Sequence, residues 1–159
     1  FRDYYTDLNL LVCPNDLGRA TAVKDPKYES DSAPRSYIFN GWNDYFQEMM
    51  SKTNTFQFRN VQGSSMREES IDKPADTILF GEKDSKSGHF YMDFLESAEG
   101  NDNTELEQAR HMGGAARGGG SNYAFADGSV RMLKFWESLR PVNQWAVTER
   151  WRRPEQAHP

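Results

Sequence analysis

The strongest constraint on the fold is the segment 122–135, where two runs of strand-forming residues flank the pair Asp127-Gly128. Asp-Gly between such runs is typical of a two-residue β-hairpin turn. Closure on this turn would pair Ala124 with Arg131 and would place alternate residues on one side of the hairpin. The residues expected on the core side are Tyr123, Phe125, Val130 and Met132.

Hydrophobic patterning predicts the remaining elements. Strands are expected at 36–42, 56–61, 77–81 and 89–95, and helices at 44–51, 105–109 and 141–152. In the last of these helices, Trp145 is expected to dock on the sheet. The fold class is therefore α+β, with a small antiparallel sheet, short peripheral helices and long loops.

The length and composition indicate a single domain that covers residues 1–159. Within it we expect an exposed loop at 15–34, a glycine-rich connector at 112–121 and a tail at 154–159. The hydrophobic content is 36%, and the aromatic content of 13% supplies bulky side chains for a core.

The net charge and hydropathy bear on partners and location. A formal net charge of -5 argues against nucleic acid, whose binding needs a basic face. No apolar run approaches the roughly 20 residues of a membrane-spanning helix. Because the chain starts at Phe1 rather than Met, we expect further residues, including any targeting segment, upstream of it.

No catalytic or cofactor-binding residues are predicted. A serine, His111 and Asp127 could form a triad on paper, but the Gly-x-Ser-x-Gly nucleophile motif is missing. The single cysteine, Cys13, is either a buried apolar residue or half of a disulfide with a partner outside the chain.

Metal binding is the more serious chemical alternative. Ligand-type residues in or beside the predicted sheet are Glu82, His89, Asp93, His111 and Asp127. No His-x-x-x-His or Cys-x-x-Cys spacing occurs, so zinc ligands would have to come from distant segments. The competing interpretation is that Asp127 caps its own turn and that the histidines are ordinary hydrogen-bonding residues.

A calcium site is a second metal alternative. The loop 100–105 offers oxygen ligands, among them Asp102 and Glu105, but it lacks the spacing of an EF-hand. The competing interpretation is a solvated acidic loop. Both alternatives stay open at this point.

Three motifs occur in a recognisable order. They are Cys13-Pro-Asn-Asp16, Ser36-Tyr-Ile-Phe-Asn-Gly-Trp42, and Arg110-His111 followed by a glycine-rich spacer and the run from Asn122 to Leu133 with its Phe-x-Asp-Gly turn. This set resembles bacterial prepilin-type proteins, the family of pseudopilins and type II secretion protein G-like subunits. The hydrophobic N-terminal helix of that family is not in this chain.

The resemblance implies a pilin-like head domain. Its precursor would be anchored in the inner membrane, cleaved by a prepilin peptidase and assembled with other pilin-like subunits into a type IV pilus-like or type II secretion filament. The head would be a non-enzymatic structural subunit, periplasmic or at the cell surface. The alternatives are an extracellular glycan- or metal-binding module, using aromatics such as Trp42, Trp136 or Trp151, and a metal-dependent hydrolase.

Overall fold

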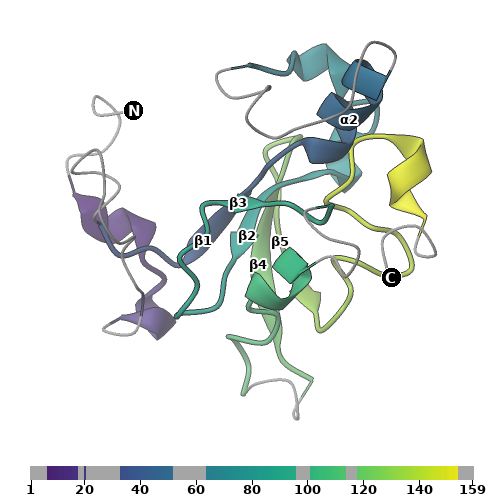
Figure 1. Cartoon of the computed structure of the whole chain (residues 1–159). Helices are drawn as coiled ribbons and strands as arrows, with labels where there is room; N and C mark the ends of the chain where they lie inside the picture. The colour runs from purple at the N-terminus through teal and green to yellow at the C-terminus, as the bar shows by residue number, and fades with distance from the viewer. Residues whose placement is uncertain are drawn as a thin grey trace.

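The computed structural model describes residues 7–17, 20, 33–51, 64–95, 101–113 and 118–153. These residues form a small α+β fold with a five-stranded sheet in the order β3-β1-β2-β4-β5 (Figure 1). The strands are β1 (Tyr37–Asn40), β2 (Ile78–Glu82), β3 (Tyr91–Met92), β4 (Gly120–Phe125) and β5 (Val130–Lys134). The α-helix of the described region is α2 (Asn43–Ser51), as the sequence predicts.

Short 3-10 turns connect these elements. They are η1 (Leu8–Leu11), η2 (Pro14–Asp16), η3 (Glu68–Ser70), η4 (Pro74–Asp76), η5 (Asn101–Glu105) and η7 (Glu149–Arg152). The predicted strand at 56–61, the tail at 154–159 and most of the predicted loop at 15–34 lie outside the described residues.

The sheet is mixed rather than purely antiparallel, which corrects the expectation from the sequence. β1 is antiparallel to β2 and parallel to the short β3. The chain reverses direction after β2 and returns on the far side of β1. A strand that runs opposite to β2 on that side is necessarily parallel to β1.

The hairpin forms where the sequence predicts it, but its register is shifted by one residue. Ala124 is paired with Val130 rather than with Arg131. The Phe125 amide donates to the Ser129 carbonyl over 2.9 Å, and Gly128 has a φ of 84°. The loop therefore contains three residues and ends in a left-handed glycine, which is the second common hairpin geometry.

The shift reverses the faces of β5. Side chains alternate along a strand, so a displacement of one residue exchanges its buried and exposed sets. Val130 and Met132, both expected in the core, are 67% and 43% exposed, whereas Leu133 is buried. Tyr123 and Phe125 are buried as predicted.

The core lies on one face of the sheet. Its buried members are Ile38, Ile78, Met92, Phe94, Leu106, Tyr123, Phe125, Leu133, Leu139, Trp145 and Ala146. Trp145 is fully buried, as expected, and its ring makes an edge contact with the Tyr123 ring at 6.1 Å between centroids. Close approach of these rings requires Gly81, since a Cβ there would lie 2.4 Å from the Tyr123 ring.

The predicted helix at 141–152 is wrong except for its last turn, η7. The backbone before η7 bonds to the sheet instead. The Ile78 amide donates to the Gln144 carbonyl (2.8 Å), and the Asn40 side-chain amide donates to the Trp145 carbonyl (2.7 Å). These tertiary hydrogen bonds occupy groups that a helix would have needed.

The predicted helix at 105–109 is also wrong. The helical turn is η5, which ends at Glu105, and the chain then runs extended beside the end of β2. Leu106 forms an isolated bridge with Lys83, and the Glu107 amide donates to the Glu82 carbonyl over 3.1 Å. Pairing with β2 therefore overrides the local helical preference of this segment.

Gly120 lies at the boundary between the glycine-rich segment and the sheet. The sequence places it in a connector at 112–121, whereas the structure places Gly120 and Ser121 in β4. A Cβ at Gly120 would lie 2.2 Å from the Leu133 carbonyl oxygen. We expect Gly120→Ala to lower the free energy of unfolding by about 1–3 kcal/mol, because the backbone of β5 must move.

Gly88→Ala is the matched control, because a Cβ there would meet no atom within 4 Å. Urea denaturation of both variants measures the difference. Equal stability of the two variants would contradict the close approach of β4 and β5 at Gly120.

Candidate functional site

A buried cluster of charged side chains lies where the N-terminal segment meets the sheet. Asp16 ends η2, Glu82 ends β2, and Arg110 and His111 precede the glycine-rich segment. Asp16 and Glu82 are fully buried. The burial of Asp16 corrects the expectation of an exposed loop at this end of 15–34. Pro14, at the first position of η2, turns the chain so that Asp16 points inward.

Asp16 is held by three donors. The Ser36 hydroxyl donates to Oδ2 over 2.7 Å, the Ser85 hydroxyl donates to Oδ1, and Arg110 Nη1 lies 2.6 Å from Oδ2. Burial alone would raise the pKa of Asp16, but the hydrogen bonds from Ser85, Ser36 and Arg110 outweigh it and hold the pKa below its usual range. The carboxylate is therefore ionised in the folded protein.

Glu82 accepts from the opposite side of the cluster. The Asn122 amide donates to Oε2 over 2.8 Å, and the guanidinium Nε of Arg110 lies 3.4 Å from Oε1. Arg110 thus stands between two buried carboxylates, and its side chain is 6% exposed. A buried cation in this position balances charge that would otherwise be costly.

His111 completes the cluster. Its Nε2 lies 3.0 Å from Glu82 Oε1 and 3.8 Å from the Cys13 sulfur, and its Nδ1 lies 3.0 Å from the Asn15 side-chain amide. The Cys13 amide donates to the Ser36 hydroxyl over 3.0 Å. Cys13 is buried and free, and burial raises the pKa of its thiol. Cys13, Glu82 and His111 place their ligand atoms within 4.8 Å of one another.

The structure brings together only some of the predicted ligands. Glu82 and His111 meet, whereas His89 pairs with Asp102 at 3.0 Å. Asp127 lies at the exposed hairpin turn, where it accepts from the Ser129 amide and hydroxyl. It is therefore a turn cap, as the competing interpretation held, and these hydrogen bonds lower its pKa.

The loop proposed for calcium is partly buried rather than solvated. Asp102 is 1% exposed. One of its oxygens faces His89, and the other accepts from the Asp93 amide over 2.8 Å. The carbonyl of Glu105 accepts from the Asp84 amide. Asp102 thus links η5 to the residues that flank β3, by accepting from the Asp93 amide and by its 3.0 Å contact with His89.

Sequence reasoning missed Asp16, Arg110 and Cys13 as members of one cluster. The available signal was the order of the motifs, because Cys13-Pro-Asn-Asp16, Ser36 and Arg110-His111 all contribute side chains here. Asn40, in the second motif, instead holds the core by donating to the carbonyls of Ile78 and Trp145. The motifs therefore have structural roles that spacing alone does not reveal.

Comparison with known proteins adds no relative. The chain matches no protein-family model, and no match is found among curated proteins or solved structures. Functional inference therefore depends on the geometry of the chain itself.

Arg110 is predicted to carry much of the stability of the cluster. We expect Arg110→Met to lower the free energy of unfolding by about 3–5 kcal/mol, because it leaves two carboxylates buried without their cation. Arg67→Met is the matched control, since Arg67 pairs with Glu69 where both side chains are largely exposed. Its expected cost is below about 1 kcal/mol. Similar costs in chemical denaturation would contradict a buried role for Arg110.

The lowered pKa of Asp16 predicts that the stability of the protein depends on pH. A carboxyl whose folded pKa is lowered contributes stability above its unfolded pKa, about 3.9, and loses that contribution as the pH falls through the folded value. We expect Asp16→Asn to be less stable at neutral pH and to lose less stability than the parent protein below about pH 4. Thermal unfolding from pH 7 to pH 2 measures this. Parallel curves for the two proteins would contradict the prediction.

Proposed function

We propose that this chain is the head domain of a pilin-like filament subunit with a structural rather than catalytic role. The observation that carries the proposal is an apolar outer face of the sheet, opposite the core. The apolar residues on this side, which we call the outer face, are Tyr37, Phe39, Phe80, Tyr91, Ala124, Val130 and Met132. Glu82, opposite Tyr37, and Asn122, opposite Met132, end this face at the charged cluster.

The pairing of the strands makes the outer face continuous. Phe39 is opposite Phe80 and Tyr91, Phe80 is opposite Ala124, and Ala124 is opposite Val130. The Phe39 and Phe80 rings are 5.5 Å apart. Phe39, Tyr91 and Val130 are 44%, 55% and 67% exposed.

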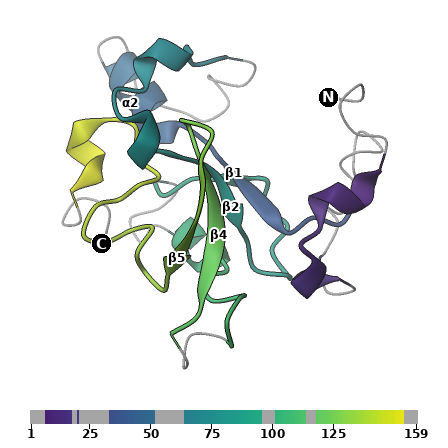
Figure 2. The same ribbon diagram turned by 180° about the vertical axis from the view of Figure 1, so that it is seen from behind.

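In the view from behind, no described helix crosses β2 and β4 (Figure 2). Beside β1, Leu10 and Leu11 of η1 line a hollow with Tyr37, Phe39 and Phe80, so η1 borders one end of the outer face. η5 lies on the other side of the sheet (Figure 1). A contiguous apolar surface of this kind on a protein in water usually marks a site of interaction.

An apolar helix is the partner that a pilin-like subunit would supply. In such a subunit the long N-terminal helix holds the filament together and the head packs against it. The resemblance of the three motifs supports the same assignment. No helix among the described residues has the length and apolar character needed to cross a membrane.

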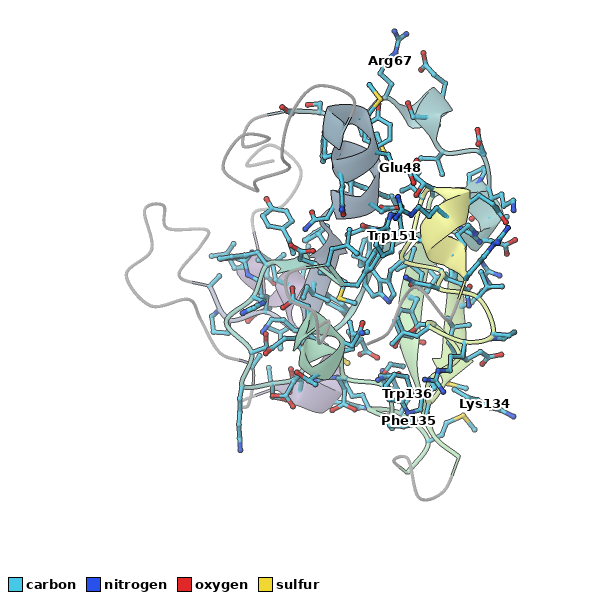
Figure 3. All side chains as sticks on the ribbon, turned by 45° about the vertical axis from the view of Figure 1, so that its right-hand side comes forward. Glu48, Arg67, Lys134, Phe135, Trp136 and Trp151 are labelled. Carbon is cyan, nitrogen blue, oxygen red and sulfur yellow. The ribbon has the colours of Figure 1, made fainter. Side chains whose placement is uncertain are left out.

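The rival assignment, a glycan-binding module, needs a platform of exposed aromatics. Trp145 is fully buried, and Trp151 packs partly buried against the core near Phe94. Trp136 is 37% exposed, but it lies far from Trp151 (Figure 3). These two indoles therefore do not form one sugar-stacking surface.

Phe39→Glu in the full-length protein, produced in its own bacterium, tests the proposal. We expect the variant to fold but to be lost from sheared surface filaments, because a carboxylate cannot be buried under an apolar helix without a partner. Immunogold labelling with an antibody against the head, together with immunoblots of the sheared fraction, measures incorporation.

Met49→Glu is the control, since it introduces the same charge at a residue that is 56% exposed on α2. It should enter filaments normally. Two results together would refute the proposed function. The parent protein would be recovered only outside the filament fraction, and its precursor would be cleaved to the same extent in cells that lack prepilin peptidase.

A further inference from the structure

The side chains of Cys13, Glu82 and His111 form a second feature that the filament role does not use. They come from three separate parts of the chain: the residue before η2, the end of β2 and the segment before the glycines. Each brings a different donor atom: sulfur, carboxylate oxygen and imidazole nitrogen. Such a set, gathered within 4.8 Å, is the composition of a transition-metal site.

The distances suit a tetrahedral ion. Two ligands on a tetrahedral zinc, with bonds of about 2.0–2.3 Å, lie about 3.3–3.7 Å apart. The Cys13 sulfur is 3.8 Å from His111 Nε2, and that nitrogen is 3.0 Å from Glu82 Oε1. Both values lie within a few tenths of an ångström of the required range. The Cys13 sulfur and the Glu82 carboxylate lie within 4.8 Å of each other, so these two side chains must approach each other for all three ligands to bind one ion.

The backbone already holds the ligands in place. The Cys13 amide is bonded to Ser36, and the other oxygen of Glu82 accepts from the Asn122 amide. The His111 amide donates to the Gly120 carbonyl over 2.9 Å, which fixes the segment beside β4. Binding would therefore require little ordering of the chain.

Asn15 provides the outer partner that a metal-bound histidine needs. Its side-chain amide lies 3.0 Å from Nδ1 of His111. An imidazole that binds a metal through Nε2 carries its proton on Nδ1 and donates it to an oxygen. The Asn15 amide supplies that oxygen after a half-turn about its last bond, because its two ends are nearly the same shape.

Charge is also compatible with a divalent ion. Asp16 and Glu82 carry two negative charges against the positive charge of Arg110. Coordination deprotonates a thiol, so a bound dication and the Cys13 thiolate together bring this set to neutrality. Arg110 retains Asp16 at 2.6 Å as its closer partner when Glu82 Oε1 turns to the metal.

We infer that Cys13, Glu82 and His111 bind one Zn²⁺ ion, with a water molecule at the fourth position on the partly exposed side of His111. A mixed sulfur, nitrogen and oxygen set favours zinc over calcium or magnesium, which take oxygen ligands. The ion would fasten the N-terminal segment to the end of β2. This inference is independent of the filament proposal.

Titration of the untagged, chelator-treated protein with ZnCl₂ and CoCl₂ tests the inference. We expect one equivalent of Zn²⁺ to bind in competition with a chromophoric chelator and to raise the melting temperature. Co²⁺ should give a thiolate charge-transfer band in the near ultraviolet. Because the chain has one cysteine, this band can come only from Cys13, and Zn²⁺ should also protect that thiol from alkylation.

Cys13→Ser and His111→Gln should lose stoichiometric Zn²⁺ binding. The control His89→Gln, at a histidine that pairs with Asp102 instead, should retain it. Circular dichroism of the metal-free variants shows whether they fold. If the variants do not fold, the parent protein still tests the inference. Failure of the parent protein to bind one equivalent of Zn²⁺ would overturn it, and so would Co²⁺ binding without the thiolate band. Loss of binding in His89→Gln would overturn it as well.

Discussion

The Arg110 guanidinium, between the carboxylates of Asp16 and Glu82, is the interaction on which the arrangement of the chain depends. It joins the N-terminal segment, the end of β2 and the segment that leads into β4. Three charges in a buried site are stable only while all are present, since removal of one leaves the others uncompensated. The cluster therefore ties together parts of the chain that are distant in sequence.

The two sides of the sheet have different roles. One side carries the core, with Trp145 packed on Tyr123. The other presents the outer face, whose aromatic rings remain partly exposed. The partly exposed apolar side is the surface that the proposed packing in a filament would cover. Cys13, Glu82 and His111 lie where the N-terminal segment meets the end of β2. A bound metal ion would hold these two parts of the chain together.

Much of the fold was predictable from local sequence. β1, α2, β2 and the hairpin lie where patterning places them. The two wrong helix predictions share one cause, which is competition from tertiary hydrogen bonds. Residues 141–148 use backbone groups to bond the sheet and the core rather than to form a helix. The hairpin register depended on whether Gly128 ended a two- or three-residue loop, a choice that the Asp-Gly pair allows in either form.

In the candidate site, too, some features follow from local sequence and others depend on tertiary structure. The sequence by itself determined the ligand types, the turn chemistry of Asp127-Gly128 and the order of the motifs. Tertiary structure decided which of those residues meet: Glu82 with His111 and Cys13, His89 with Asp102, and Asp127 with its own turn. The physical reason is that turns depend on neighbouring residues, whereas buried charges are satisfied by whatever partners the packed chain brings within reach.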